Sequence, residues 1–206
     1  MILTEDYVRK TIEEVAPLIE EESQLKCNLI DYSVDLLTFK KIAKDRGCSL
    51  KSAHKLYGSY KHNYFGGLPE LMFPKKYLGN LDLFKKTVSH ECFHNAQFSN
   101  FPYFYIQYND PEFCPQNISE ENFLFSLRCL ADGDATLIEN ILSKKYFKNP
   151  HLIYKNRRVL GINKNVYLHG EKVLRQKFND GKDRKGINEL YSAPVEELVK
   201  IFGVRD

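Results

Sequence analysis

The stretch His90-Glu91-Cys92-Phe93-His94 is an H-E-x-x-H motif, and it indicates both a helix and a metal site. Residues four apart lie on one face of an α-helix, so the imidazoles of His90 and His94 can reach a single metal ion. The carboxylate of Glu91, one position on from His90, can address a water bound to the same metal. The spacing therefore predicts a Zn²⁺ site with two nitrogen ligands, an adjacent base and one open coordination position.

The residues around the motif predict the helix that this geometry requires. Asn80 suits the N-cap position and Asp82 suits the first turn. Residues at helical spacing form one stripe, which contains Leu83, Phe84, Thr87, His90, Glu91, His94 and Phe98. We therefore expect both histidines on the inward face of an amphipathic helix, with Cys92 facing away from them in the core. The alternative is a pair of buried histidines that make ordinary hydrogen bonds.

Length and composition bound the class of protein. The chain has 206 residues, 43% hydrophobic and 28% charged, which suits one globular domain with its own core. A net charge of +3, with the lysines spread along the chain, does not indicate nucleic-acid binding. No apolar run is long enough to cross a membrane, and the acidic N-terminus lacks a signal-peptide core, so we expect a cytoplasmic protein. The five irregularly spaced cysteines predict neither a disulfide framework nor a C-x-x-C metal knuckle.

The periodicity of the first half outlines its other elements. Residues 5–22 carry an apolar stripe typical of a helix, and residues 26–38 show the partial alternation of a strand or hairpin. Residues 49–57 predict a short helix that ends at Gly58. The glycine pair and two prolines of residues 64–74 favour an edge strand or a turn beside a cleft over a central strand.

The second half is expected to be mainly helical. Residues 99–117 contain three prolines and several aromatic residues, which predict a long loop. Asn117 then fits the cap of a helix that runs to about residue 145. Further expected elements are a helix over about 165–178, a polar connection at 180–186 and a final short helix after Pro194.

A third metal ligand must come from outside the motif, because a catalytic zinc usually takes three protein ligands and leaves one position for water. Asp132 is the candidate, in the stretch Ala131-Asp132-Gly133-Asp134-Ala135. Glu139 and Cys129 are its rivals. The alternative interpretation makes Asp132 and Asp134 ordinary surface acids.

This combination of motifs resembles the gluzincin-type metallopeptidases, in particular a microbial set that carries H-E-x-x-H and then E-G-x-A. In that set the Glu of E-G-x-A is the third ligand. Asp132 matches its position, so the resemblance implies Asp132 as the third Zn²⁺ ligand. The side chain is one methylene shorter, although a carboxylate oxygen is a normal zinc donor.

Neighbours of Asp132 are expected to support the site. A glycine inside a helix costs about 1 kcal/mol against alanine, so we expect Gly133 to permit a close approach to the motif helix. Thr136 and Glu139 lie on the same helical face as Asp132. Either of them can orient a ligating imidazole.

The resemblance continues more weakly downstream. Tyr167-Leu168-His169-Gly170 is similar to a Y-x-x-G pattern, and the segment from Asn188 to Pro194 is similar to N-x-x-Y-x-x-P. The matching segments together span about residues 85–200. Many gluzincins stabilise the oxyanion with a downstream Tyr or His, which implies Tyr167 and His169 as catalytic residues here. Alternatively, Tyr167 is a core residue and His169 is an exposed polar one.

The fold that the resemblance implies is a single zincin-like α+β domain over residues 1–206. It has an N-terminal α/β part of about 1–98, with a small mixed sheet and the motif helix. A mainly helical part of about 117–206 follows and carries the third ligand.

The function that the resemblance implies is that of a zinc metallopeptidase with a peptide or protein substrate. His90, His94 and Asp132 would hold Zn²⁺, and Glu91 would act as the base. An extended peptide could add as a strand to the expected edge at residues 64–73. Two other hypotheses stay open: a catalytically silent zinc-binding protein, and a helical interaction protein in which the motif is accidental.

Overall fold

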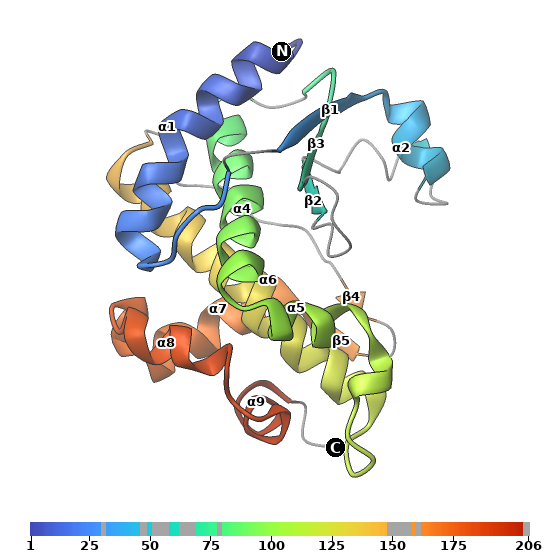
Figure 1. The fold of residues 1–206 in the computed structure, drawn as a ribbon, viewed down its shortest axis with the longest axis vertical. Coiled ribbons are helices and arrows are strands. Elements are labelled where there is room, and N and C mark those ends of the chain that lie inside the picture. Colours follow the sequence, from blue (N-terminus) through green and yellow to red (C-terminus); the bar gives the residue numbers. More distant parts are fainter. Residues whose placement is uncertain are drawn as a thin grey trace.

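The structure is a computed structural model that combines a small sheet with a larger set of helices (Figure 1). It describes residues 1–29, 32–45, 49–50, 58–61, 69–77, 80–147, 158–159 and 162–203. Helices and strands are both present in these ranges, so the expected α+β class is confirmed. Among the described residues, no helix is both long enough and apolar enough to cross a membrane.

The helical elements follow most of the predicted periodicity. The helices are α1 (Glu5–Ser23), α2 (Phe39–Asp45), α4 (Leu81–Asn100), α5 (Pro102–Asn109), α6 (Glu120–Lys145), α7 (Val166–Lys177), α8 (Arg184–Leu190) and α9 (Val195–Phe202). Two 3₁₀ turns lie at Pro111–Phe113 and Asn179–Gly181. The helices expected over 5–22 and 165–178 and after Pro194 are confirmed as α1, α7 and α9. The helix expected over 49–57 lies almost entirely outside the described residues.

The strands form two small sheets. They are β1 (Ser33–Leu37), β2 (Ser59–Lys61), β3 (Glu70–Pro74), β4 (Arg158–Val159) and β5 (Ile162–Asn165). The first three make a mixed sheet in the order β1-β3-β2, with β1 parallel and β2 antiparallel to β3. The described residues of the segment 26–38 therefore contribute one strand, β1, and β4 pairs with β5 in a separate antiparallel hairpin.

The expectation of an edge strand or turn at residues 64–74 is wrong for the described part of that segment. β3 is the central strand of its sheet, between β1 and β2. Its two prolines do not interrupt the ladder, because Pro69 precedes the strand and Pro74 is its last residue. Backbone bonds from Ser33 N to Pro69 O and from Lys75 N to Leu37 O continue the pairing at both ends. Residues 64–68 lie outside the described ranges.

The motif helix α4 forms as its capping residues predict. The Asn80 side chain accepts a hydrogen bond from Leu83 N, which satisfies one of the free donors of the first turn. α4 packs against α1 on one side and α6 on another (Figure 1). The side chain of Cys92 is fully buried in the core between α4 and its neighbours, as predicted.

The loop expected over residues 99–117 is largely helical instead. Pro102 occupies the first turn of α5, where its missing N–H removes no helical hydrogen bond. The aromatic residues of this segment supply packing; Phe104 is buried and meets the ring of Tyr191 edge-on, with ring centroids 4.9 Å apart. The prediction of Asn117 as a helix cap is also wrong, because the Ser119 side chain caps α6 by accepting from Asn122 N.

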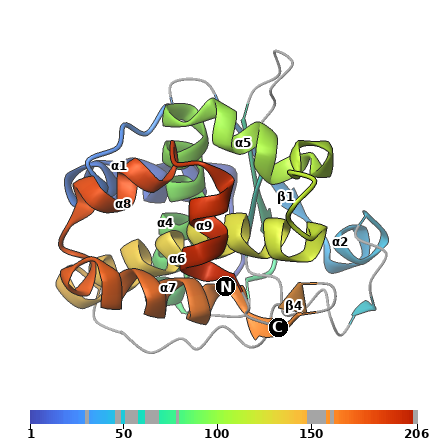
Figure 2. The same ribbon diagram turned by 90° about the horizontal axis from the view of Figure 1, so that it is seen from below.

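The expected polar connection at 180–186 ends earlier than predicted. α8 begins at Arg184, because Asp183 caps it by accepting a hydrogen bond from Gly186 N. The buried side chains of Ile187 and Leu190 then anchor α8 in the apolar cluster of the C-terminal half. α7 and α9 pack against α6, and α8 lies beside them (Figure 2). The long helix α6 thus packs against both α4 and the C-terminal helices and contributes buried side chains to both apolar clusters.

Candidate metal centre

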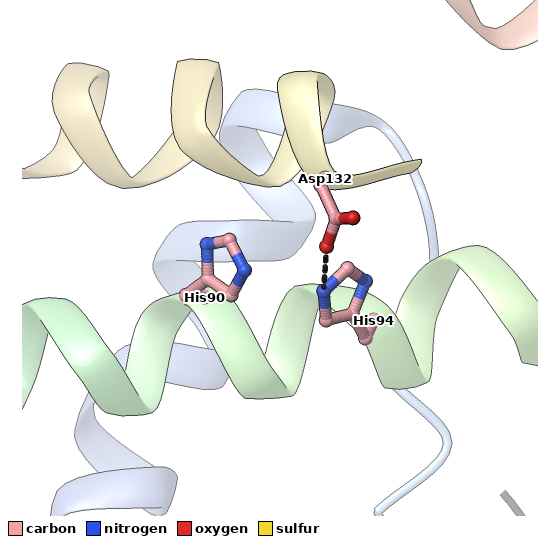
Figure 3. A group of neighbouring side chains, drawn as sticks. All are labelled: His90, His94 and Asp132. Carbon is pink, nitrogen blue, oxygen red and sulfur yellow. Dashed lines mark ion pairs between the residues drawn. The ribbon is translucent and has the colours of Figure 1, made fainter. Parts of the chain in front are cut away.

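The structure brings His90, His94 and Asp132 together at the crossing of α4 and α6 (Figure 3). One potential ligand atom from each residue lies within 4.8 Å of the other two. His94 Nε2 and Asp132 Oδ1 are 3.5 Å apart. The three residues are only 4%, 8% and 2% exposed. This group can hold a metal ion, and the convergence agrees with the prediction that Asp132 faces the motif.

The histidine pair follows directly from the helical spacing of the motif. The His90 and His94 rings are one turn apart on α4, with centroids 4.8 Å apart and planes at 89°. The His94 ring also stacks on Phe98, one further turn along, at 5.6 Å and 7°. Local helix geometry and packing therefore fix how the two imidazoles face α6.

The carboxylate of Glu139 on α6 lies against Nδ1 of His90. Glu139 Oε2 lies 3.2 Å from His90 Nδ1, and Glu139 is fully buried. Burial alone would lower the pKa of His90, but the Glu139 carboxylate, then the charges of Glu91 and Asp132, outweigh it and raise that pKa. With Nδ1 turned to Glu139, Nε2 is the nitrogen available to a metal. Carboxylates commonly hold metal-binding histidines in this way.

Glu139 is itself paired with a buried lysine that the sequence motifs do not single out. Lys86 is 1% exposed, and its Nζ lies 3.6 Å from Glu139 Oε1. Lys86 also donates to Asn140 Oδ1 at 2.8 Å, and Asn140 donates to Glu171 Oε1 at 2.9 Å. Arg175 completes the network at the surface by donating to Glu171. A lysine four residues before His90 on a buried stripe is the sequence signal that could have found it.

Nδ1 of His94 lies against the side-chain amide of Gln97. Gln97 Oε1 lies 2.7 Å from His94 Nδ1, and both groups are buried. Gln97 donates its amide hydrogens to Ala131 O at 2.9 Å and to the Tyr191 hydroxyl at 2.5 Å. Tyr191 in turn donates to Asp134 Oδ2 at 3.0 Å. Gln97 is three residues after His94 on the same helical face, which is the signal that points to it in the sequence.

The rival ligands take other roles or lie outside the group. Glu139 contacts Nδ1 of His90 and so supports the ligand, as one of the two predicted orienting residues. Thr136, the other, does not orient an imidazole, because its hydroxyl donates to Asp132 O at 2.8 Å within α6. Cys129 is buried in the apolar cluster and does not belong to the His90, His94 and Asp132 group.

The alternative in which Asp132 and Asp134 are surface acids is wrong for both residues. Asp132 faces the two histidines. Asp134 is completely buried and accepts two hydrogen bonds from the Arg184 guanidinium, at 2.6 and 3.0 Å. Tyr191 connects Asp134 to Gln97, so the second acid belongs to the hydrogen-bond network behind His94.

Gly133 permits a close helix approach, but to a helix other than the one expected. A Cβ atom on Gly133 would lie 2.5 Å from the Cα atom of Gly170 on α7. The predicted approach to the motif helix is therefore wrong. The α6 face that carries Asp132 meets α4, whereas the neighbouring position meets α7, because adjacent residues point about 100° apart around a helix.

Glu91 lies beside the metal group and on the side of the sheet. It is 9% exposed, and a Cβ atom on Gly58, just before β2, would lie 3.0 Å from its Cγ atom. Its charge contributes to the raised pKa of His90. Glu91 is not one of the three grouped residues, so its carboxylate is not among the candidate metal ligands.

The two downstream candidates occupy different places. Tyr167 is buried, and its ring centroid lies 5.6 Å from that of His90. His169 is half-buried and turned toward the end of α9, where its Nε2 lies 3.1 Å from Phe202 O. Its ring also lies 5.5 Å from that of Phe125. The structure thus brings Tyr167, and not His169, next to a candidate ligand.

Comparisons with known proteins add no relative to this picture: no family model, no curated protein and no solved structure matches the chain. Evidence for a function therefore comes from the residues of the site itself. Two imidazole nitrogens and one carboxylate oxygen form a donor set that suits a catalytic Zn²⁺ with one position left open. The buried groups that face Nδ1 of His90 and Nδ1 of His94 strengthen that fit, because each of them leaves Nε2 of the same ring for the metal.

Proposed function

We propose that the chain is a zinc-dependent hydrolase, specifically a metallopeptidase of zincin-like fold. The observation that carries the proposal is the buried convergence of His90, His94 and Asp132, with Glu91 on the next position of the same helix. The small mixed sheet beside the motif helix supports the fold proposed. A structural zinc is closed by a fourth protein ligand, whereas the group found among the described residues has three members, which leave room for water and substrate.

The chemistry of the proposed reaction divides among few residues. When bound, Zn²⁺ supplies a Lewis acid and lowers the pKa of a water molecule to about 7. Glu91 would act as the base that takes a proton from the attacking water and gives it to the leaving amine. Tyr167 donates a hydrogen bond to the carbonyl oxygen as negative charge develops on it.

The substrate in this proposal is an extended peptide that pairs with the sheet. Because β3 is central, the edges of the described sheet are β1 and β2. β2 begins directly after Gly58, which lies beside Glu91, and β2 packs against α4. A peptide added along β2 would run past the base, so β2 replaces the 64–73 segment as the proposed docking strand.

Metal analysis and a peptidase assay with Glu91→Gln test this proposal together. We expect about one Zn²⁺ per chain and loss of that zinc in the double variant His90→Ala/His94→Ala. Glu91→Gln should keep the zinc and lose hydrolysis of a denatured protein substrate, because the amide cannot accept the proton. Tyr167→Phe should keep the zinc and lower kcat by about 10²- to 10³-fold.

The outcomes separate the alternatives. Zinc without hydrolysis in the wild type would identify a catalytically silent binding protein. Undiminished zinc in the double histidine variant, or no zinc in the wild type, would leave the motif accidental. Equal hydrolysis by wild type and Glu91→Gln would remove Glu91 from the role of base.

A further inference from the structure

A chain of buried hydrogen bonds connects helix α8, in the C-terminal half of the chain, to the candidate ligand His94. Arg184 donates a hydrogen bond to the Asp134 carboxylate at 2.6 Å. The Tyr191 hydroxyl donates to the same carboxylate at 3.0 Å. Gln97 donates to the Tyr191 oxygen at 2.5 Å and meets His94 Nδ1 at 2.7 Å. All of these side chains except His94 are 5% exposed or less.

The direction of each hydrogen bond follows from the charged end of this chain. The guanidinium of Arg184 can only donate, and the carboxylate that it pairs with, Asp134, can only accept. The hydroxyl hydrogen of Tyr191 must therefore point to Asp134. Burial and the Asp134 charge raise the pKa of Tyr191 well above its ordinary range, so the phenol keeps that hydrogen.

The orientation of the Gln97 amide is fixed by its hydrogen-bond partners in the same way. With its hydrogen given to Asp134, the Tyr191 oxygen accepts from Gln97, and the backbone carbonyl of Ala131 can only accept. Both hydrogens of the Gln97 amide are thereby used on that side. Turning the amide over would place its oxygen against Ala131 O and would take away the donor from which the Tyr191 oxygen accepts, so these two acceptors together leave Oε1 facing His94 Nδ1.

We propose that Tyr191, held by the Asp134–Arg184 ion pair, acts as a positioning residue that sets the tautomer of His94. Because Nδ1 faces an oxygen that only accepts, the neutral imidazole carries its one hydrogen there. The Asp132 carboxylate faces the other nitrogen, but its Oδ1 lies 3.5 Å from Nε2, whereas Gln97 Oε1 lies only 2.7 Å from Nδ1, so Nε2 is the nitrogen left without the hydrogen. A residue almost a hundred positions downstream thus prepares the ligand before metal arrives.

The inference rests on the proposed metal site for its purpose, but the tautomer is a property of the metal-free protein. It can be read from the ring nitrogen chemical shifts of ¹⁵N-histidine-labelled protein, at a pH where His94 is neutral. The variants are Tyr191→Phe, which removes one oxygen, and Gln97→Met, which removes the acceptor. Tyr77→Phe is the matched control, since this buried hydroxyl also bonds to α4, at Thr87 Oγ1 (2.7 Å) and Leu83 O (3.2 Å).

We expect His94 to be an Nδ1–H tautomer in the wild type and in Tyr77→Phe. Tyr191→Phe should give a mixture of tautomers, and Gln97→Met should give largely Nε2–H. Both should bind zinc about 10- to 100-fold more weakly, as is usual when a partner behind a ligand is lost. A merely structural role would lower the melting temperature without moving the tautomer.

The inference is overturned if the zinc-free wild type carries the hydrogen of His94 on Nε2. It is equally overturned if Tyr191→Phe keeps both the tautomer and the zinc affinity of Tyr77→Phe. Should Tyr191→Phe not fold, an Nδ1–H tautomer in Gln97→Met overturns the inference in its place. A wild type that binds no zinc would refute the proposed function alone, because the nitrogen shifts still decide the tautomer.

Discussion

Gly133 of α6 and Gly170 of α7 lie in direct backbone contact. A Cβ atom on Gly170 would overlap Cys129 O and lie 2.8 Å from the Cα atom of Gly133. Asp132 precedes one glycine, and Tyr167 lies three residues before the other. The crossing of α6 and α7 therefore sets where a candidate ligand and the tyrosine beside His90 lie relative to each other.

Gly170→Ala should destabilise the protein by about 3 kcal/mol, near the upper end for overpacking, because its new methyl group meets backbone that cannot turn aside. Chemical denaturation measures this. Gly186→Ala is the control, since a Cβ there meets side-chain atoms of Asp183 and Phe178. If both variants lost the same small amount of unfolding free energy, α6 and α7 would be shown to separate without cost.

Asp132→Asn should weaken zinc binding by more than the roughly 10- to 100-fold expected for a lost outer partner, because it removes a ligand charge at constant volume. Asp132→Glu should retain the metal, as the resemblance to E-G-x-A implies. Competition with a chelator measures the affinity. Glu121→Gln, on the exposed first turn of α6, is the control. Asp134→Ala is unsuitable as a control, because it would strand the buried Arg184.

Full zinc affinity in Asp132→Asn would move the third ligand elsewhere. Glu139 would be the first residue to test, because its carboxylate already lies 3.2 Å from His90.

Lys86→Met should destabilise the protein by about 3–5 kcal/mol, because it leaves the buried Glu139 carboxylate without its cation. Adding Glu139→Gln should recover part of this loss, since both charges are then gone. Thermal or chemical denaturation of the wild type, Lys86→Met, Glu139→Gln and the double variant gives the coupling energy between the two side chains. The neighbouring Lys85→Met is the control: its ion pair with Glu14 is partly exposed, so about 1 kcal/mol or less is expected. Strictly additive effects would contradict a coupled pair.

Zinc should raise the melting temperature little at acidic pH and progressively more as the pH increases. The pKa of His90 in the metal-free fold is raised above its ordinary value of about 6.5. Protonated His90 therefore stabilises the metal-free fold below that value, and this stabilisation is lost as the pH rises through the raised pKa. Zinc needs the unprotonated nitrogen, so its effect grows over the same range.

Melting curves with and without zinc, taken across this pH range, test the prediction. Glu139→Gln should move the onset to lower pH, because it removes the charge that favours protonated His90. A zinc effect independent of pH would contradict His90 as a ligand.

Local sequence is enough to locate the motif helix and its histidines. Helical periodicity relates His90 to His94, and the cap at Asn80 involves a backbone group three residues away. Both depend on neighbours along the chain. A motif resemblance on a strongly periodic helix points to Asp132 as the third residue, and the structure brings it to the same point. The helical predictions fail where proline and aromatic content suggest a loop, because packing of Phe104 stabilises α5.

Only the tertiary structure decided which residues hold Glu139 and Gln97, the groups behind the two candidate histidine ligands. Lys86 and Tyr191 carry no local pattern that assigns them to Glu139 or to Gln97, because these contacts join helices far apart in sequence. The position of β3 in its sheet and the helix that Gly133 meets depend in the same way on where other segments pack. Helix geometry is set within a turn of chain, whereas a buried charge or amide must be satisfied by whatever group the fold brings to it.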